Sequence, residues 1–129
     1  MYKILVCLDK SDEQARKQAE EITAMPMDPD AHQIQILHVF TDNPDGIAVP
    51  QVSSVRTAMD IFDEHGIEPE IIGTSGEPER EIRRVANDND VDLISLGGRK
   101  RSPTGKAIFG SVTQEVILEA DQPVVCQPL

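Results

Sequence analysis

Short apolar runs alternate with helix-like patterns along the whole chain, and this alternation limits the fold more than any other feature. Five segments are apolar enough for buried strands: 2–8, 32–40, 70–73, 91–96 and 123–128. Between them, apolar residues recur at helical spacing. Strand and helix units that repeat about every 25 residues predict a parallel sheet with helices on both faces. We therefore expect an α/β fold with four helices around a doubly wound, five-stranded parallel sheet.

Local signals place the ends of the predicted helices. Ser11 and Gln14 form a Ser-x-x-Gln capping box at the start of the first helix. The second helix has apolar residues at i, i+3, i+7 and i+10, namely Val52, Val55, Met59 and Phe62. Gly66 is expected just after that helix, and Pro78 suits the first turn of the third. The segment 41–50 is rich in turn residues and predicts an exposed loop.

Length and composition indicate one domain, residues 1–129, with an aliphatic core. Hydrophobic residues make up 39% of the chain but aromatic residues only 3%, so Ile, Leu, Val, Ala and Met must fill the interior. There is no apolar run of about 18 residues, the length that a membrane span needs. The first residues, MYKILVCLD, already form a strand pattern and do not resemble a signal peptide. We expect a cytoplasmic protein.

The chain is strongly acidic, with 23 Asp and Glu against 12 Lys and Arg and a formal net charge of −11. Phosphate backbones are repelled by such a charge, so the sequence argues against general nucleic-acid binding. Lysine is sparse, and an acidic surface suits a cytoplasm rich in salt, where screening removes self-repulsion. The sequence therefore fits a halophilic source, and it also fits an ordinary acidic cytosolic protein.

The cysteines and histidines show no metal-binding or catalytic pattern. Cys7 and Cys126 lie in apolar, strand-like segments, where cysteine is usually a small buried hydrophobe. His32, His38 and His65 are scattered, without metal-ligand spacing. No Ser-His-Asp or Cys-His arrangement is visible. We expect no metal site and no catalytic residue, and we expect His38 to be a hydrogen-bonded histidine of the core or of a strand end.

The segment 93–113, LISLGGRKRSPTGKAIFGSVT, carries the clearest functional signal. It runs from an apolar strand through Gly97 and Gly98 into a loop, and a helix pattern begins at Gly110 and Ser111. The backbone N–H groups of such a loop and the dipole of the helix both favour a bound phosphate. No acidic residue lies within the segment. This pattern predicts an anion site.

Residues 97–110, which we call the basic loop, carry four cations: Arg99, Lys100, Arg101 and Lys106. On an acidic protein, they concentrate positive potential where a phosphate would lie. The alternative is a solvated basic loop without a ligand. A P-loop is excluded because Ala107 follows Lys106, and no G-x-G-x-x-G follows the first strand. Lys106 remains a candidate phosphate contact as a point charge.

Asp9 directly follows the first predicted strand and is the acidic residue expected nearest to the basic loop. In an open doubly wound sheet, ligands bind beyond the carboxyl ends of the strands, where the strand order reverses. With the order 3-2-1-4-5, the reversal lies between the first and fourth strands. The carboxylate of Asp9 suits a ribose hydroxyl or a metal ion there, and it suits the entry of a helix equally well.

Four segments resemble the universal stress protein family, in the right order and over essentially the whole chain. They are KILVCLDKSD, QIQILHVF, SGEPEREIRRVANDNDVDLISLGGRK and GSVTQEVILEADQPVVCQPL. The resemblance implies the adenine nucleotide alpha hydrolase-like fold in a single domain and a role in stress response or signalling. It also implies a homodimer through the last strand, where Val124, Val125 and Cys126 would otherwise leave an apolar edge exposed.

Nucleotide-binding members of that family carry G-x2-G-x9-G-[ST] after the fourth strand. Gly97, Gly110 and Ser111 match three of its positions with the same spacing, but Lys100 replaces the middle glycine. The resemblance implies ATP, with Mg, as the ligand, and places Asp9 at the ribose and Val39 at the adenine. The implied site residues are Leu8, Asp9, Val39, Leu96, Gly97, Arg99, Lys100, Gly110, Ser111, Val112 and Thr113.

Lys100 leaves the function open. A glycine there lets the backbone approach a phosphate closely, whereas a lysine restricts the backbone but adds a cation. Either the protein binds ATP or a related adenine nucleotide, with Arg99, Lys100 and Arg101 on the phosphates, or it has lost the nucleotide and acts as an interaction module for an unknown protein partner. A weak ATPase is the third possibility, but the sequence shows no base to position the attacking water.

Overall fold

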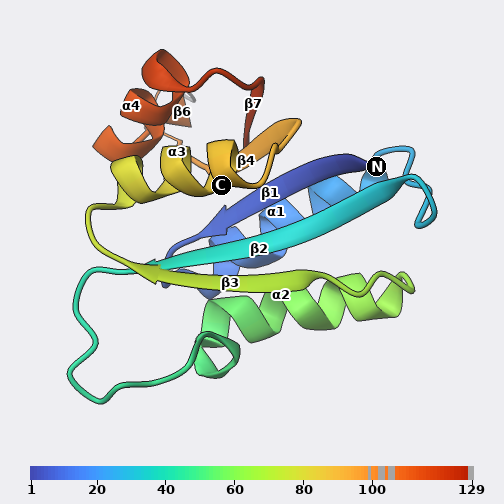
Figure 1. Ribbon diagram of the computed structural model, residues 1–129, viewed down its shortest axis with the longest axis horizontal. Helices are drawn as coiled ribbons and strands as arrows, with labels where there is room; N and C mark the ends of the chain where they lie inside the picture. The colour runs from blue at the N-terminus through green and yellow to red at the C-terminus, as the bar shows by residue number, and fades with distance from the viewer. Residues whose placement is uncertain (99, 102–103, 105–106, 128–129) are drawn as a thin grey trace.

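A parallel sheet of five strands forms the centre of the molecule (Figure 1). The computed structural model describes residues 1–98, 100–101, 104 and 107–127. The strands of the sheet are β1 (Tyr2–Leu8), β2 (His32–Phe40), β3 (Glu70–Ser75), β4 (Leu93–Gly97) and β7 (Val124–Gln127). Their order is β3-β2-β1-β4-β7, which is the predicted 3-2-1-4-5 with β7 as the fifth strand. The strand order therefore reverses between β1 and β4.

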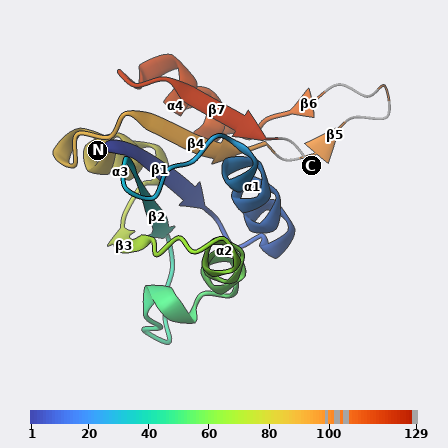
Figure 2. The same cartoon turned by 90° about the vertical axis from the view of Figure 1, so that its right-hand side faces the viewer.

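Two helices cover each face of the sheet (Figure 2). On one face lie α1 (Asp12–Ala24) and α2 (Ser53–Glu64), which pack against each other. On the other lie α3 (Pro78–Asp88) and α4 (Ser111–Glu119), which also pack together. Because side chains alternate along a strand, β2 sends its apolar residues to both faces. This arrangement confirms the doubly wound fold that the alternation of elements predicts.

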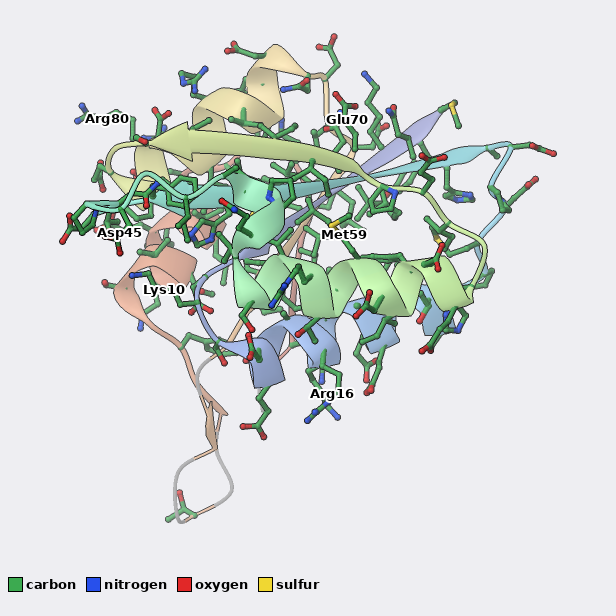
Figure 3. The ribbon with its side chains drawn as sticks, turned by 90° about the horizontal axis from the view of Figure 1, so that it is seen from below. Lys10, Arg16, Asp45, Met59, Glu70 and Arg80 are labelled. Atoms are coloured by element: carbon green, nitrogen blue, oxygen red, sulfur yellow. The ribbon has the colours of Figure 1, made fainter. Side chains whose placement is uncertain are left out.

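The core consists of two apolar clusters, one on each face of the sheet. Ile34 and Ile36 belong to the cluster under α1 and α2, and Leu37 belongs to the cluster under α3 and α4. The two clusters are built mainly from aliphatic side chains, as the composition predicts, and the ring of Phe62 is fully buried among them. Figure 3 labels one residue on each side of the layer formed by α1 and α2. Arg16 of α1 points away from the sheet, and Met59 of α2 packs against the core.

The start of α1 differs from the predicted capping box. Ser11 Oγ accepts a hydrogen bond from the backbone N–H of Gln14 (3.2 Å), which is one half of the box. The backbone N–H of Ser11 donates instead to Asp9 Oδ1 (2.8 Å). Because Asp9 takes that position, the side chain of Gln14 does not return to Ser11 and extends toward the sheet. The predicted reciprocal bond is therefore wrong.

Other element ends agree closely with the local signals. Gly66 follows α2 with a φ of 71°, a left-handed conformation that glycine adopts without strain. Pro78 is the first residue of α3. The turn-rich segment after β2 is largely exposed, and a short 3-10 helix, η1 (Val49–Gln51), closes it. None of the helices in the described part of the chain has the length and apolar character to cross a bilayer.

Two short strands within the basic loop are not predicted by the sequence. β5 (Lys100–Arg101) and β6 (Ala107–Ile108) pair antiparallel, and they form a sheet separate from the main one. Figure 2 shows that they project away from the body of the molecule. Strands of two residues are too short to show a periodic pattern, so the sequence predicts only a loop there.

Candidate functional site

A cavity of about 630 Å³ opens at the carboxyl ends of β1, β2 and β4, where the strand order reverses. The first turns of α1, α3 and α4 complete its walls. Its apolar lining residues include Leu37, Val39, Ile82, Leu96 and Val112. Its polar and glycine residues include Asp9, Ser11, Gln14, Gly97, Gly98 and Gly110. Such a mixed lining suits a ligand that has both an apolar group and an anionic group.

Most of the predicted site residues come together around this cavity. Those that line it are Leu8, Asp9, Val39, Leu96, Gly97, Gly110, Val112 and Thr113. Ser111 begins α4 and is exposed, but it is not part of the lining. The backbone of Lys100 lies in β5, and Arg99 lies outside the described residues. The roles of these residues in binding stay predictions.

Asp9 joins the end of β1 to the start of α1. One carboxylate oxygen, Oδ1, accepts from the backbone N–H of Ser11, and the backbone carbonyl accepts from Ser54 Oγ. Asp9 is therefore a helix-entry residue, one of the two roles that the sequence allows. Its side chain is exposed and lines the cavity, and in the described part of the chain Oδ2 has no hydrogen-bond partner. This second oxygen remains available to a ligand.

The first turn of α4 lies beside the cavity, which Gly110 and Val112 line, and among the described residues no side chain caps its backbone N–H groups. Gly110 is its N-cap residue and has no side chain to accept from them. Such an uncapped helix start carries a partial positive charge and favours an anion. Thr113 Oγ1 donates to the carbonyl of Gly97 (2.9 Å) and ties this turn to the end of β4. The backbone N–H of Gly98 is not free to bind an anion, because it donates to the carbonyl of Gln127 (2.9 Å).

Gln14 is a cavity residue that the sequence analysis missed as such. It is 5% exposed, and its Nε2 donates to the backbone carbonyl of Gln127 (2.6 Å). A Cβ atom added at Gly97 would overlap Gln14 Cγ and lie 2.6 Å from Cδ. Gly97 is therefore required by packing against Gln14, whatever a ligand requires. The available signal was a glutamine on the apolar face of a predicted helix, four residues before the similarly buried Gln18.

His38 lies at the end of β2 and is 2% exposed. Its Nδ1 is 2.8 Å from the carbonyl oxygen of Leu8, and its ring meets Phe40 edge to face with centroids 4.8 Å apart. The prediction of a hydrogen-bonded histidine at a strand end is confirmed. The residue also lines a second cavity of about 480 Å³, together with Lys10 and Asp45. Figure 3 shows Lys10 and Asp45 at the same end of the molecule.

Neither cysteine has the surroundings of a reactive thiol. Both are free, and Cys7 is buried in the cluster under α3 and α4. Burial raises the pKa of the Cys7 thiol far above its usual range, and partial burial raises the pKa of Cys126 as well. A raised pKa keeps a thiol protonated and unreactive. Both residues fit the predicted role of small hydrophobes.

Three carboxylates gather outside the cavity, in a position that the sequence did not predict. Ligand atoms of Glu77, Glu79 and Glu115 lie within 4.8 Å of one another. Glu79 is buried and forms a bidentate ion pair with Arg83 one turn further along α3. Arg83 therefore balances the buried negative charge of Glu79 within the protein itself.

The fold and sequence are similar to those of known stress proteins. A model of the "Universal stress protein family" matches residues 1–128. A universal stress protein structure from Archaeoglobus fulgidus is 31% identical, with a TM-score of 0.72 and 98% of each chain covered. Universal stress protein MJ0577 from Methanocaldococcus jannaschii is 36% identical over 50 residues. That match spans 39% of this chain and only 31% of the relative.

Two more distant structures share the fold and are described with a nucleotide. A universal stress protein from Archaeoglobus fulgidus in complex with dAMP is 24% identical, with a TM-score of 0.68 and 98% and 97% of the two chains covered. One from Arabidopsis thaliana with AMP bound is 16% identical, with a TM-score of 0.73 and 99% and 92% covered. Because the family model spans nearly the whole sequence, this chain belongs to the universal stress protein family.

Proposed function

We propose that the protein binds an adenine nucleotide in the cavity between β1 and β4. The observation that carries this proposal is one cavity whose lining combines apolar side chains, the carboxylate residue Asp9 and the uncapped start of α4. A base would lie beside Val39 and Leu96. The ribose hydroxyls would meet Asp9 Oδ2, and the phosphates would lie at the N-terminus of α4. The two relatives described with dAMP and AMP support this class of ligand.

The triphosphate form, with Mg, is the ligand that we propose in the cell. Arg99, Lys100, Arg101 and Lys106 would add positive charge near the phosphates, on a chain whose overall net charge is −11. Among the described residues that line the cavity, Asp9 is the only one with a carboxylate, and its Oδ1 is already bonded to the N–H of Ser11. Binding, rather than hydrolysis, is therefore the proposed activity, with occupancy reported to a partner protein in stress response or signalling.

Thermal unfolding with excess Mg-ATP, AMP or inorganic phosphate tests the proposal. A ligand at 100 times its dissociation constant adds about 2.7 kcal/mol of stability, which raises the melting temperature clearly. The variant Gly110→Val places a branched side chain at the uncapped start of α4 and should abolish the shift. Glu119→Val, at the exposed other end of α4, is the matched control and should keep it. No shift for the wild-type protein with any nucleotide would overturn the proposal.

The second candidate function is a protein-interaction module without a nucleotide, which Lys100 in the motif-glycine position favours. Lys100→Gly separates the two functions. If lysine is a phosphate ligand, glycine should weaken ATP binding. If lysine blocks the site, glycine should create or strengthen ATP binding, and the wild-type protein is then the interaction module. Calorimetric titration of both proteins with Mg-ATP measures the difference.

A further inference from the structure

The second cavity, of about 480 Å³, lies at the start of α2 and is distinct from the one that we assign to the nucleotide. The end of β2, the loop after it and residues 51–53 line this space, together with Lys10 from the loop after β1. Of the described residues, only Lys10 and His38 line both cavities. The volume falls within the range of small-molecule sites.

The imidazole of His38 lies on the side of this second cavity. Residues along β2 alternate between the two faces of the sheet. Ile36 and Phe40 face the core cluster under α1 and α2, so His38, which lies between them, faces the same way. Phe40 lines the second cavity, and its ring meets the imidazole edge to face with centroids 4.8 Å apart. Leu37 and Val39 face the opposite way and line the first cavity.

Nε2 of the His38 ring is a hydrogen-bond acceptor without a partner. Nδ1 lies 2.8 Å from the carbonyl oxygen of Leu8, which can only accept, so Nδ1 carries the proton and donates it. In the neutral imidazole, Nε2 is then an acceptor. Within the described ranges it makes no hydrogen bond, and it is not among the fully enclosed polar atoms that lack one. Since His38 is only 2% exposed, a ligand in the cavity is the partner that this nitrogen can meet.

The charged side chains around this cavity are also free to bind. The amide of Asn43 is occupied, because it exchanges two hydrogen bonds with the backbone of Ile47 (2.9 and 3.1 Å). The carboxylates of Asp42 and Asp45 make no hydrogen bond or ion pair with the parts of the chain that the structure describes. Two carboxylates against the single ammonium of Lys10 leave one negative charge on the lining. Free acceptors and negative charge together favour a cation that carries N–H donors.

The spacing of these groups favours an organic cation over a bare metal ion. Among the described residues, only Glu77, Glu79 and Glu115 bring three ligand atoms within 4.8 Å of one another. The nitrogen of His38 and the two carboxylates are therefore spread more widely than one ion would bring them. A molecule of several atoms can bridge such distances, and a primary ammonium group supplies both the charge and three N–H donors.

We propose that this second cavity binds a small organic molecule with a primary ammonium group, which donates hydrogen bonds to His38 Nε2 and to the carboxylates of Asp42 and Asp45. The inference does not rest on the proposed nucleotide-binding function, because Asp42 and Asp45 line only the second cavity. Hydrogen bonds that involve a charged group are worth enough to change affinity by about tenfold or more.

Calorimetric titration with ethanolamine and with choline, at equal ionic strength, tests the proposal. The two probes share their charge and their hydroxyethyl group, but choline has no N–H donor. Ethanolamine should bind the wild-type protein about tenfold or more tightly than choline. In NMR spectra of the imidazole nitrogens, the Nε2 resonance of His38 should move when ethanolamine is added. The resonances of His32 and His65, which lie outside the cavity, should not.

The double variant Asp42→Asn with Asp45→Asn removes both carboxylates with little change in side-chain size, and it should weaken ethanolamine binding by about tenfold or more. Asp60→Asn with Asp63→Asn is the matched control, because it changes the charge equally on exposed residues toward the other end of α2. The control should bind ethanolamine as the wild-type protein does. His38→Phe keeps an aromatic ring without the acceptor, so the preference for ethanolamine over choline should disappear.

Three results would each overturn the proposal: equal affinities of the wild-type protein for ethanolamine and choline, an Nε2 resonance of His38 that does not move, or equal losses of affinity in the two double variants. The absence of ethanolamine binding at millimolar concentration would overturn it as well. If His38→Phe unfolds, the nitrogen resonances of the wild-type protein and the aspartate variants still decide. All of these outcomes leave the nucleotide proposal for the first cavity unchanged.

Discussion

Gln14 Nε2 donates a hydrogen bond to the backbone carbonyl oxygen of Gln127, 2.6 Å away, and thereby joins the first turn of α1 to β7. The same oxygen accepts from the N–H of Gly98. A helix, the end of β4 and an edge strand therefore meet at one atom. This junction forms the wall of the cavity from which the basic loop departs.

The first prediction concerns the close packing of Gly97 against Gln14. Gly97→Ala should lower the free energy of unfolding by about 1–3 kcal/mol, because the new methyl group overlaps the Gln14 side chain and forces it away from Gln127. Urea unfolding of the wild-type protein and of the variant measures the change. The double variant Gly97→Ala with Gln14→Ala should lose less stability than the two single losses added together. If the stability losses of the two single variants simply added up in the double variant, the methyl group added at Gly97 and the side chain of Gln14 would not compete for space.

The second prediction concerns the buried ion pair of α3. The Glu79 side chain is 8% exposed and is held by Arg83, so Arg83→Met should cost about 1–3 kcal/mol by leaving a desolvated carboxylate without its partner. Arg80→Met is the matched control, because the pair of Arg80 with Glu77 is exposed on both sides. It should change stability by less than about 0.5 kcal/mol. Equal losses in chemical unfolding would contradict the difference in burial.

The third prediction is a pH dependence on the same helix. A hydrogen bond from Arg84 lowers the pKa of Glu81 below its usual value. A lowered pKa in the folded state means that the stabilisation is present above the ordinary glutamate pKa and is lost as pH falls through the lowered value. The melting temperature of the wild-type protein should therefore exceed that of Arg84→Gln at pH 7, and the gap should narrow toward pH 3. If the difference in melting temperature between the two proteins did not change with pH, the hydrogen bond between Arg84 and Glu81 would not be its cause.

The fourth prediction concerns the edge of the sheet. In the described part of the chain, β7 pairs only with β4, and Val125 is 38% exposed. We propose that a second copy of the chain covers this edge in a homodimer, since an exposed apolar edge strand invites pairing. Val125→Lys should convert the dimer to a monomer in light scattering, whereas Ile47→Lys, on an exposed loop, should leave it intact. A wild-type protein that is already monomeric would refute the proposal.

The fifth prediction follows from the acidic composition. With a net charge of −11, the folded chain repels itself, and salt screens this repulsion. The melting temperature should rise as potassium chloride increases from low to molar concentration. Choline chloride at equal ionic strength is the comparison for an effect specific to potassium. A melting temperature that falls steadily with either salt would rule out self-repulsion as the dominant charge effect.

The fold was predictable because each element carries its own signal. The apolar run of β1 and the helical spacing around Phe62 are local patterns, and together with βαβ connections they leave few topologies. The sequence did not predict side-chain contacts that its local patterns do not encode. No local pattern shows that Gln14 donates a hydrogen bond to Gln127, 113 residues further along the chain. Nor does one show that Asp9, rather than Gln14, accepts from the backbone N–H of Ser11.

The candidate site was predictable for residues that follow a strand or precede a helix. Asp9, Gly97 and Gly110 are such residues, and the topology alone brings them to one edge of the sheet. His38 was assigned correctly as a hydrogen-bonded histidine, but its partner, the carbonyl of Leu8, follows from the register of β1 against β2. Only three-dimensional packing supplies that information.

The hydrogen bonds to the carbonyl of Gln127 can form only late in the synthesis of the sheet. Synthesis delivers β1, α1, β2, α2 and β3 first, so these elements can pack while later residues are still being added. The oxygen that fixes Gln14 and Gly98 belongs to β7, which the ribosome makes after every other strand of the sheet. A nascent chain that has not yet reached β7 therefore lacks the oxygen that closes this wall of the cavity.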